Sequence, residues 1–232
     1  SESLPRVAGV DGCRAGWLVI LDEGDDFLAG ICEDFEQVLE QTASCAAVAV
    51  DMPIGLLDVA ERGGRPVDRL ARQLLPGQTS SVFSPPPRCV LDFEPGEYRT
   101  KVLEKCRETS LPPGIGLAKQ TWMIAPRIRE IDALMTPQLQ ERIFEMHPEV
   151  AFRVLNGGER LAGKKTPKGE GERLRLLGDD LAFLVQDVRR DLLKKDAATD
   201  DIVDAAAGVL VARRRLAGTA VRLLGDPPRD SR

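Results

Sequence analysis

Short apolar runs and longer amphipathic stretches alternate along the chain, and their order predicts an α/β protein. Two runs, Val7–Val10 and Ala46–Val50, contain no polar residue, and each leads directly into an aspartate. Unalternating runs of this length are typical of strands buried on both faces, as in a parallel sheet covered by helices. Two further runs, Ala15–Leu21 and Phe27–Cys32, also predict strands, and the acidic segment between them predicts a turn.

Helical spacing of apolar residues accompanies these strands. Glu33–Glu40 predicts a helix before the fourth strand, and Arg142–Met146 alternates polar and apolar residues as a fifth strand would. Further helices are expected at 67–75, 95–109, 117–135 (with a kink or restart at Pro126), 170–177, 181–193 and 200–216. The predicted order is therefore β-β-β-α-β-α-β-α, a mixed five-stranded sheet flanked by helices.

The segment from about 53 to 140 differs from the rest of the chain because proline and glycine cluster in it. The clusters lie at 75–77, 84–87 and 111–114. Segments of this kind inside a compact domain often bind ligands or close over a site. We interpret it as a helical insertion between the fourth and fifth strands of a single domain spanning 1–225, followed by a disordered tail at 226–232.

Composition and net charge restrict the classes of function that this chain could have. The chain has 232 residues and a formal net charge of −5, which argues against a general nucleic-acid coat protein but not against an enzyme with a local basic patch. One histidine and five scattered cysteines disfavour zinc sites and His-dependent nucleophilic catalysis. No apolar run reaches the roughly 20 residues of a membrane span. We therefore expect a cytoplasmic protein without a membrane partner, whose oligomeric state stays open.

Asp11 and Asp51 directly follow the two uninterrupted apolar runs. In open α/β sheets, functional residues gather beyond the carboxyl ends of the strands. If the two strands are parallel neighbours, they lie roughly 4.8 Å apart. Two carboxylates at that separation repel each other unless a cation lies between them. The pair therefore predicts a site for Mg²⁺ or Mn²⁺, which prefer oxygen ligands.

A third informative segment is Thr199–Gly208. Thr199 is the expected N-cap, and aspartates in the first turn favour the helix dipole. Asp204 lies beyond the cap positions and precedes Ala-Ala-Ala-Gly, a run of small residues that lets a helix pack closely on a sheet. A carboxylate on such a face is costly without a cation, so Asp204 is a candidate metal ligand. Asp201 points the same way and is a second candidate, although an ordinary helix start also explains it.

A basic loop at Gly163–Gly169 offers contacts to phosphate. Lys165 and Lys168 in the loop, Arg173 beyond it and Arg88 in the insertion are candidate substrate-binding residues, because each would neutralise phosphate charge. A solvated charged loop explains the same residues equally well.

His147 and Glu149 follow the fifth strand, so they are expected at the same edge of the sheet. His147 would orient a water molecule or contact the substrate, and Glu149 is a further candidate substrate-binding residue. A histidine hydrogen-bonded in a turn fits the pattern equally well. Glu145 alternates with apolar neighbours and is interpreted as a surface residue.

The order of elements resembles the ribonuclease H-like plan, in which the first and fourth strands are adjacent and parallel. The acids resemble those of Holliday-junction resolvases, where residues on the first strand, the fourth strand and the last helix bind two divalent metals. Asp51 departs from that pattern, because resolvases usually carry glutamate there. Over nearly its whole length the chain also resembles a family of bacterial and archaeal proteins described as predicted nucleases of this fold. The motifs that carry this resemblance are V-x-G-V-D-G-C-R-x-G-W at Val7–Trp17, V-A-V-D-M-P-I-G-L at Val48–Leu56, D-x-x-A-R at Asp68–Arg72, S-S-V-F-S-P-P-P-R at Ser80–Arg88, G-I-G-L-A-K-Q at Gly114–Gln120, E-M-H-P-E at Glu145–Glu149, the Lys165, Gly169 and Arg173 stretch, and D-D-I-V-D-A at Asp200–Ala205.

The resemblance implies a divalent-metal-dependent nuclease that hydrolyses phosphodiester bonds of nucleic acid. Its catalytic and metal-binding residues would be Asp11, Asp51, Asp201 and Asp204, holding Mg²⁺ or Mn²⁺ ions roughly 3.5–4 Å apart. One alternative is a non-catalytic nucleic-acid or nucleotide-binding regulatory protein on the same fold. Another is an ATPase-like phosphotransferase, which would need two such domains where this chain has room for one.

Overall fold

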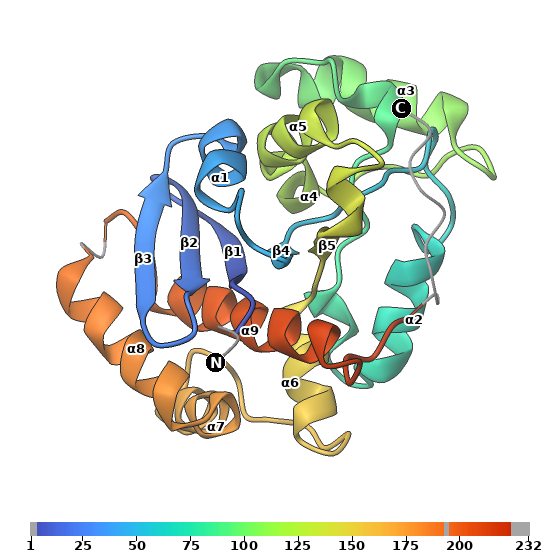
Figure 1. Cartoon of the computed structure of the whole chain (residues 1–232). Helices are drawn as coiled ribbons and strands as arrows, with labels where there is room; N and C mark the ends of the chain where they lie inside the picture. Colours follow the sequence, from blue (N-terminus) through green and yellow to red (C-terminus); the bar gives the residue numbers. More distant parts are fainter. Residues whose placement is uncertain (1–3, 193–194, 224–232) are drawn as a thin grey trace. The chain divides into compact units, whose positions relative to one another are not determined.

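The computed structural model describes residues 4–192 and 195–223 (Figure 1). The tail predicted to be disordered, 226–232, lies outside the described residues. The described chain divides into two compact units. Residues 4–52 and 134–221 form the sheet unit, and Pro53–Ala133 form the helical unit.

The sheet unit contains a five-stranded mixed sheet with the strand order β3-β2-β1-β4-β5. The strands are β1 (Val7–Cys13), β2 (Gly16–Asp22), β3 (Phe27–Cys32), β4 (Ala47–Asp51) and β5 (Ile143–Glu145). Strands β1, β2 and β3 are antiparallel neighbours, whereas β4 runs parallel to both β1 and β5. The predicted α/β class and the parallel pairing of the two uninterrupted apolar runs are therefore confirmed.

Strand β1 is longer than its apolar run suggested. Gly12 and Cys13 still pair with β2, so the turn of the hairpin lies at residues 14–15. The expected end of the strand at Asp11 was wrong, because hydrogen bonding to β2 continues through residues whose sequence resembles a turn. Asp11 consequently lies within the strand, two residues before its end.

Among the described residues, five helices and one short 3₁₀ segment complete the sheet unit. They are α1 (Phe35–Gln41), the 3₁₀ turn Leu139–Glu141, α6 (Pro148–Leu155), α7 (Pro167–Leu177), α8 (Asp179–Asp191) and α9 (Thr199–Leu216). Helix α6 was not predicted, because its single apolar stripe is short and follows a strand without a separating turn. Proline at its first position provides the start, as the fixed φ of proline suits that position.

Helix α9 crosses one face of the sheet (Figure 1), and its Ala205–Gly208 run is buried there. A Cβ atom added to Gly9 would lie 1.9 Å from the backbone oxygen of Ala205. One added to Gly208 would lie 2.8 Å from the Cα of Gly9. The expected close packing of the helix on the sheet is thus confirmed, and it depends on glycine at both facing positions.

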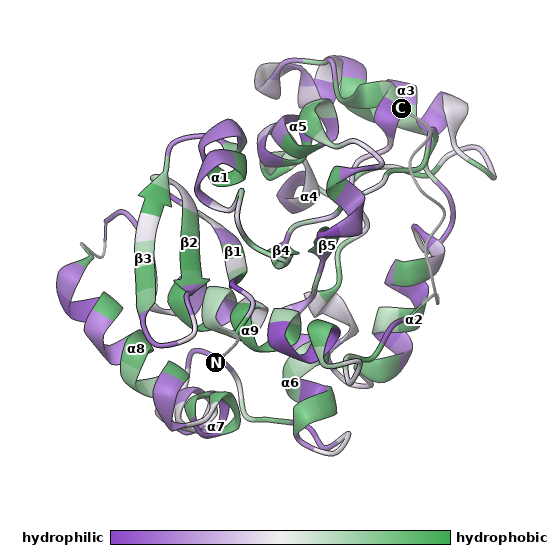
Figure 2. Ribbon diagram, viewed as in Figure 1, coloured by the Kyte–Doolittle hydropathy of each residue, from purple (hydrophilic) through white to green (hydrophobic). Residues whose placement is uncertain are grey.

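Different helices cover the two faces of the sheet. Apolar residues of α6, α7, α8 and α9 share one core with Leu18 and Ile20 of β2. Trp17 points to the opposite face, where its ring meets that of Phe35 on α1 edge-on at 5.1 Å between centroids. Figure 2 shows the corresponding pattern, with hydrophobic residues along β2 and mixed hydrophobic and hydrophilic positions along α8. None of the described helices is long and apolar enough to cross a membrane.

The helical unit has short helices and a core of its own. Its elements are α2 (Pro66–Leu74), the 3₁₀ turns Thr79–Ser81, Arg88–Val90 and Pro95–Glu97, the π-helical turn Tyr98–Val102, α3 (Leu103–Thr109), α4 (Lys119–Met123) and α5 (Ala125–Leu134). The break between α4 and α5 agrees with the restart expected at Pro126. The core contains Val90, Val102, Cys106, Leu117, Trp122 and Ala125.

Candidate metal centre

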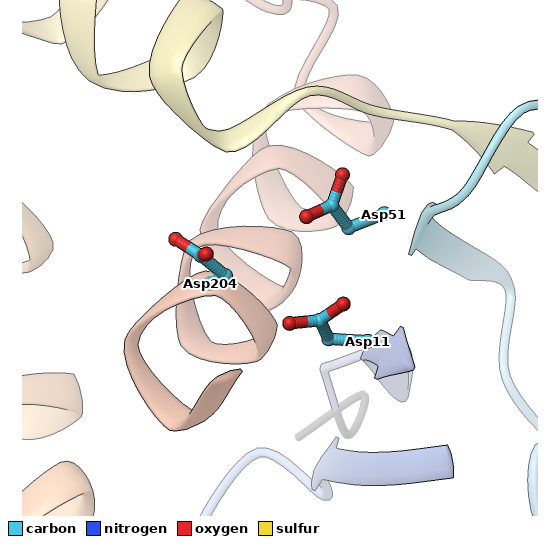
Figure 3. A group of neighbouring side chains, drawn as sticks. All are labelled: Asp11, Asp51 and Asp204. Atoms are coloured by element: carbon cyan, nitrogen blue, oxygen red, sulfur yellow. The ribbon is translucent and has the colours of Figure 1, made fainter. Parts of the chain in front are cut away.

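Three aspartates from three elements of the sheet unit meet at one end of the parallel strand pair. Asp11 of β1 lies opposite Asp51 of β4 in the register of the sheet, and Asp204 comes from α9. Carboxylate oxygens of the three lie within 4.8 Å of one another. Figure 3 shows Asp11 and Asp51 extending from the strands toward the helix that carries Asp204.

Local geometry explains how the chain brings these side chains together. Alternate residues of a strand share a face, so Asp11 lies on the same face as Gly9, where α9 makes its closest approach. Asp204 immediately precedes the small residues of that contact, so its carboxylate is held against the strand ends. Asp11 is 7% exposed and Asp204 5% exposed, while Asp51 is half-buried.

The cluster is poor in compensating groups. Within residues 4–192 and 195–223, the side chains of Asp11 and Asp51 form neither a hydrogen bond nor an ion pair. Asp204 accepts a hydrogen bond from the Nζ of Lys164 at 3.1 Å. Buried carboxylates are normally hydrogen-bonded or paired, so the three together lack the positive charge or donors that burial requires.

Burial raises the pKa of each carboxyl group in the cluster, and neighbouring negative charges add to the effect. For Asp11, burial raises the pKa well above its ordinary value, and the charges of Asp51 and Asp204 add to the effect. For Asp51, burial is again the main cause, followed by Asp204. Burial raises the pKa of Asp204 to about 6, although Lys164 opposes the shift. A bound cation would remove much of this cost.

Lys164 is a functional candidate that the sequence did not single out. Its Nζ lies 3.1 Å from Asp204 and 3.5 Å from Asp200. Burial lowers the pKa of its amine, but Asp204 and Asp200 outweigh burial and leave the pKa above its ordinary value. Lys165, which was expected to bind phosphate, forms no ion pair with the described residues and lines a pocket beside the cluster. The sequence shows two adjacent lysines, and only the fold distinguishes them.

Asp201 lies outside the group of three. Its Oδ2 accepts a hydrogen bond from the backbone N–H of Ala198 at 2.8 Å, so it stabilises the start of α9. Ala198 occupies the N-cap position, and the expected N-cap, Thr199, is the first helical residue. That expectation was wrong because the backbone turns into the helix one residue earlier. The charge of Asp201 nevertheless contributes to the raised pKa of Asp11.

Arg173 and Glu149 form a buried ion pair. Arg173 is 2% exposed, and its Nη2 donates to both carboxylate oxygens of Glu149 at 2.8 Å. Its Nη1 donates to the backbone oxygens of Ala162 and Gly169 at 2.9 Å. The pair therefore ties α6 and α7 to both ends of the basic loop. In this structure Arg173 and Glu149 pair with each other, and their contact with substrate stays a prediction.

The remaining candidates lie in different surroundings. His147 is the half-buried N-cap residue of α6. Lys168, on α7, is largely exposed and lies 3.9 Å from Glu172. Arg88 belongs to the helical unit, where it donates to Asp132 at 2.8 Å.

Glu145 of β5 lies beside Val50 in the sheet, and its charge helps to raise the pKa of Asp51. It is half-buried. The alternation of polar and apolar residues along β5 indicated that Glu145 points to the face opposite that of Phe144 and Met146. The proximity to Asp51 follows only from the pairing of β4 with β5.

Comparison with known proteins identifies the family to which the chain belongs. The family described as "Protein of unknown function (DUF429)" matches residues 9–229. No curated protein and no solved structure matches the chain. Because the match spans most of the chain and includes all three aspartates of the cluster, the chain belongs to the DUF429 family of proteins of unknown function.

Proposed function

We propose that this protein is a divalent-metal-dependent nuclease that hydrolyses phosphodiester bonds of nucleic acid on a ribonuclease H-like fold. One observation carries the proposal. Carboxylate oxygens from β1, β4 and α9 lie within 4.8 Å of one another. The two carboxylates on the strands, Asp11 and Asp51, form no hydrogen bond or ion pair with the described residues.

The donor set of the cluster suits Mg²⁺ or Mn²⁺. Asp11, Asp51 and Asp204 offer only carboxylate oxygens, which hard divalent cations prefer, and no histidine or cysteine belongs to the group. Buried carboxylates with raised pKa values are stabilised by a cation more strongly than exposed ones, because the cation replaces missing solvation. The residues therefore fit the proposed ion, and these three would hold it.

The arrangement of elements supports the same proposal. The order β3-β2-β1-β4-β5, with β4 parallel to both neighbours, agrees with the ribonuclease H-like plan expected from the sequence. The last helix of the plan carries an acid to the ends of the first and fourth strands, as α9 carries Asp204. Asp51 remains the difference from resolvases, because its side chain is one methylene shorter than glutamate.

The residues of the chain would divide the work of phosphodiester hydrolysis. A bound divalent ion supplies Lewis-acid polarisation of a phosphate oxygen and lowers the pKa of water. Lys164 and Lys165 line a pocket next to Asp204, where their positive charge would attract phosphate. Arg173 and Glu149 would keep the loop of these lysines in place.

The proposal is tested by cleavage assays on a panel of DNA and RNA substrates, both single- and double-stranded, with Mn²⁺, Mg²⁺ or EDTA. We expect metal-dependent cleavage that falls more than about 100-fold in Asp11→Asn, since a direct ligand should matter more than an outer-sphere partner. Asp25→Asn, which removes one exposed aspartate in a turn of the same unit, is the matched control. Equal activity in wild type and Asp11→Asn would overturn the proposal. Tight Mn²⁺ binding without cleavage of any substrate would favour the regulatory alternative.

A further inference from the structure

The side chain of Lys164 is the one cation that the described residues place in contact with the aspartate cluster. It lies 3.1 Å from Asp204 and 3.5 Å from Asp200, and 38% of its side chain is exposed. Its positive charge also opposes the raised pKa values of Asp11 and Asp51. Without a metal, this ammonium is therefore the main partial compensation for the three carboxylates of the cluster.

The backbone on both sides of Lys164 is hydrogen-bonded to the rest of the sheet unit. On one side, the N–H of Ala162 donates to Glu172 at 2.8 Å, and the oxygen of Ala162 accepts from Arg173 at 2.9 Å. On the other side, the oxygen of Gly163 accepts from the hydroxyl of Thr166 at 2.8 Å. A tethered, partly exposed amine of this kind changes partners by rotation about its side-chain bonds, without rearrangement of the loop.

The second partner of Lys164 would bind in a pocket of ≈ 210 Å³. It is lined by Lys164, Lys165, Thr199 and Asp204, among others, and thus adjoins the cluster directly. Its lining also includes Arg173 and the acids Glu170 and Asp200, and Glu170 is paired with Arg189 at 2.8 Å. Once a metal holds Asp204, the two lysines are left to attract an anion, and the N-terminal turn of α9 at Thr199 adds the positive end of the helix dipole. A phosphate group in this pocket would lie beside the proposed metal ligands.

We propose that Lys164 is a positioning residue that exchanges partners: its ammonium pairs with Asp204 when no metal is bound, is displaced by a divalent cation, and then binds a phosphate oxygen of the substrate in the adjoining pocket. This inference rests on the proposed function, because it names how the same site receives its phosphate. In this exchange both sets of negative charges keep a cationic partner. The divalent cation replaces the ammonium at the aspartates, and the ammonium then pairs with the phosphate.

The first test measures Mn²⁺ affinity by electron paramagnetic resonance of the free ion. Lys164→Met removes the competitor for Asp204, so we expect about fivefold tighter Mn²⁺ binding, the equivalent of an ion pair worth about 1 kcal/mol. Lys195→Met, which removes an exposed lysine of the same unit, should leave the affinity unchanged. A purely structural role of Lys164 would weaken binding, so unchanged or weaker binding in Lys164→Met overturns the inference.

The second test uses the wild-type protein and therefore does not depend on a variant that folds. Acylation of lysine amines, followed by mass spectrometry, should show Lys164 becoming more reactive when Mg²⁺ replaces EDTA, with Lys195 as the internal reference. Inorganic phosphate added with Mg²⁺ should protect Lys164 again. Reactivity that does not respond to Mg²⁺, in a protein that binds Mn²⁺, refutes the exchange and leaves the metal site standing. Absence of Mn²⁺ binding in both wild type and Lys164→Met refutes the metal site itself.

Discussion

At the scale of single residues, the aspartates of the cluster are costly mainly because they are withdrawn from water, and for Asp11 the charges of Asp51 and Asp204 add to that cost. Asp11 is buried, forms no hydrogen bond or ion pair with the described residues, and faces Asp51 across the parallel strands. Natural proteins keep such strain at functional sites, where a ligand relieves it. The cost should therefore be measurable as lost stability in the absence of metal.

Replacing Asp11 with asparagine should stabilise the metal-free protein. The amide removes one of three mutually repelling charges and can donate a hydrogen bond to a neighbouring carboxylate, so we expect about 1 kcal/mol more free energy of unfolding in EDTA. Urea denaturation at neutral pH measures it, with Asp25→Asn as the exposed control. In Mg²⁺ the ranking should reverse, because only the wild type gains binding free energy. A less stable Asp11→Asn protein in EDTA would contradict this prediction.

The pH dependence of stability follows from the raised pKa values. The folded chain holds protons on Asp11, Asp51 and Asp204 that the unfolded chain has already released, so it binds more protons between about pH 4 and the folded pKa values. The contribution of each group to stability is therefore present at low pH and lost as the pH rises through its raised folded pKa, which for Asp204 is about 6.

Comparison of wild type with Asp204→Asn isolates this contribution from the other titrating groups. In EDTA, the free energy of unfolding of the wild type should fall relative to the variant by about 1–3 kcal/mol as the pH rises from about 5 to 8. Saturating Mg²⁺ should abolish the difference in slope. A difference that grows in the opposite direction would show that the carboxyl groups are stabilised as anions without metal.

At the scale of elements, the site depends on how closely α9 approaches β1. Gly9 and Gly208 face each other, and a Cβ at either position would meet backbone atoms closer than 3 Å. Backbone cannot move aside as a flexible side chain does, so a larger residue displaces the whole helix. Asp204 is carried by that helix, four residues before Gly208, and would move with it.

Gly9→Ala should therefore lower both stability and metal affinity. We expect a loss of about 1–3 kcal/mol in the free energy of unfolding, typical of overpacking, together with weaker Mn²⁺ binding. The matched control is Gly30→Ala on β3, where an added Cβ meets nothing within 4 Å. Chemical denaturation and Mn²⁺ titration measure the two effects. A Gly9→Ala protein as stable as Gly30→Ala would show that the helix tolerates the displacement.

At the scale of the whole molecule, the chain forms two compact units with separate cores. All three aspartates belong to the sheet unit, and so do Lys164 and the basic loop. Each unit contains one tryptophan, Trp17 in the sheet unit and Trp122 in the helical unit, of the two in the chain. The two rings therefore report the unfolding of the two units separately.

Divalent metal should stabilise the two units unequally. In Trp122→Phe, whose fluorescence comes from Trp17, Mg²⁺ should raise the midpoint of thermal unfolding, because the metal binds only the folded sheet unit. In Trp17→Phe, the transition reported by Trp122 should shift little. Fluorescence melts with Mg²⁺ or EDTA make the comparison. Equal shifts in both variants would show that the units unfold as one cooperative system.

Much of this architecture was predictable from local patterns. The strands, α1 and α9 follow from apolar runs and helical spacing, and the pair Asp11 and Asp51 follows from the ends of two such runs. Helix α6 was missed because its apolar positions are few and its start follows a strand directly. The division of roles between Lys164 and Lys165 was also beyond prediction, since adjacent residues differ only in which one faces the cluster.

The sequence by itself determined which strands are buried, that α9 carries small residues for a close contact, and that three aspartates stand at the critical positions. It did so because burial and periodicity are local properties of the chain. Only the tertiary structure decided that Lys164 pairs with Asp204 and that Arg173 pairs with Glu149. Those choices depend on charges that meet across long separations in sequence, where distance and burial set the energy.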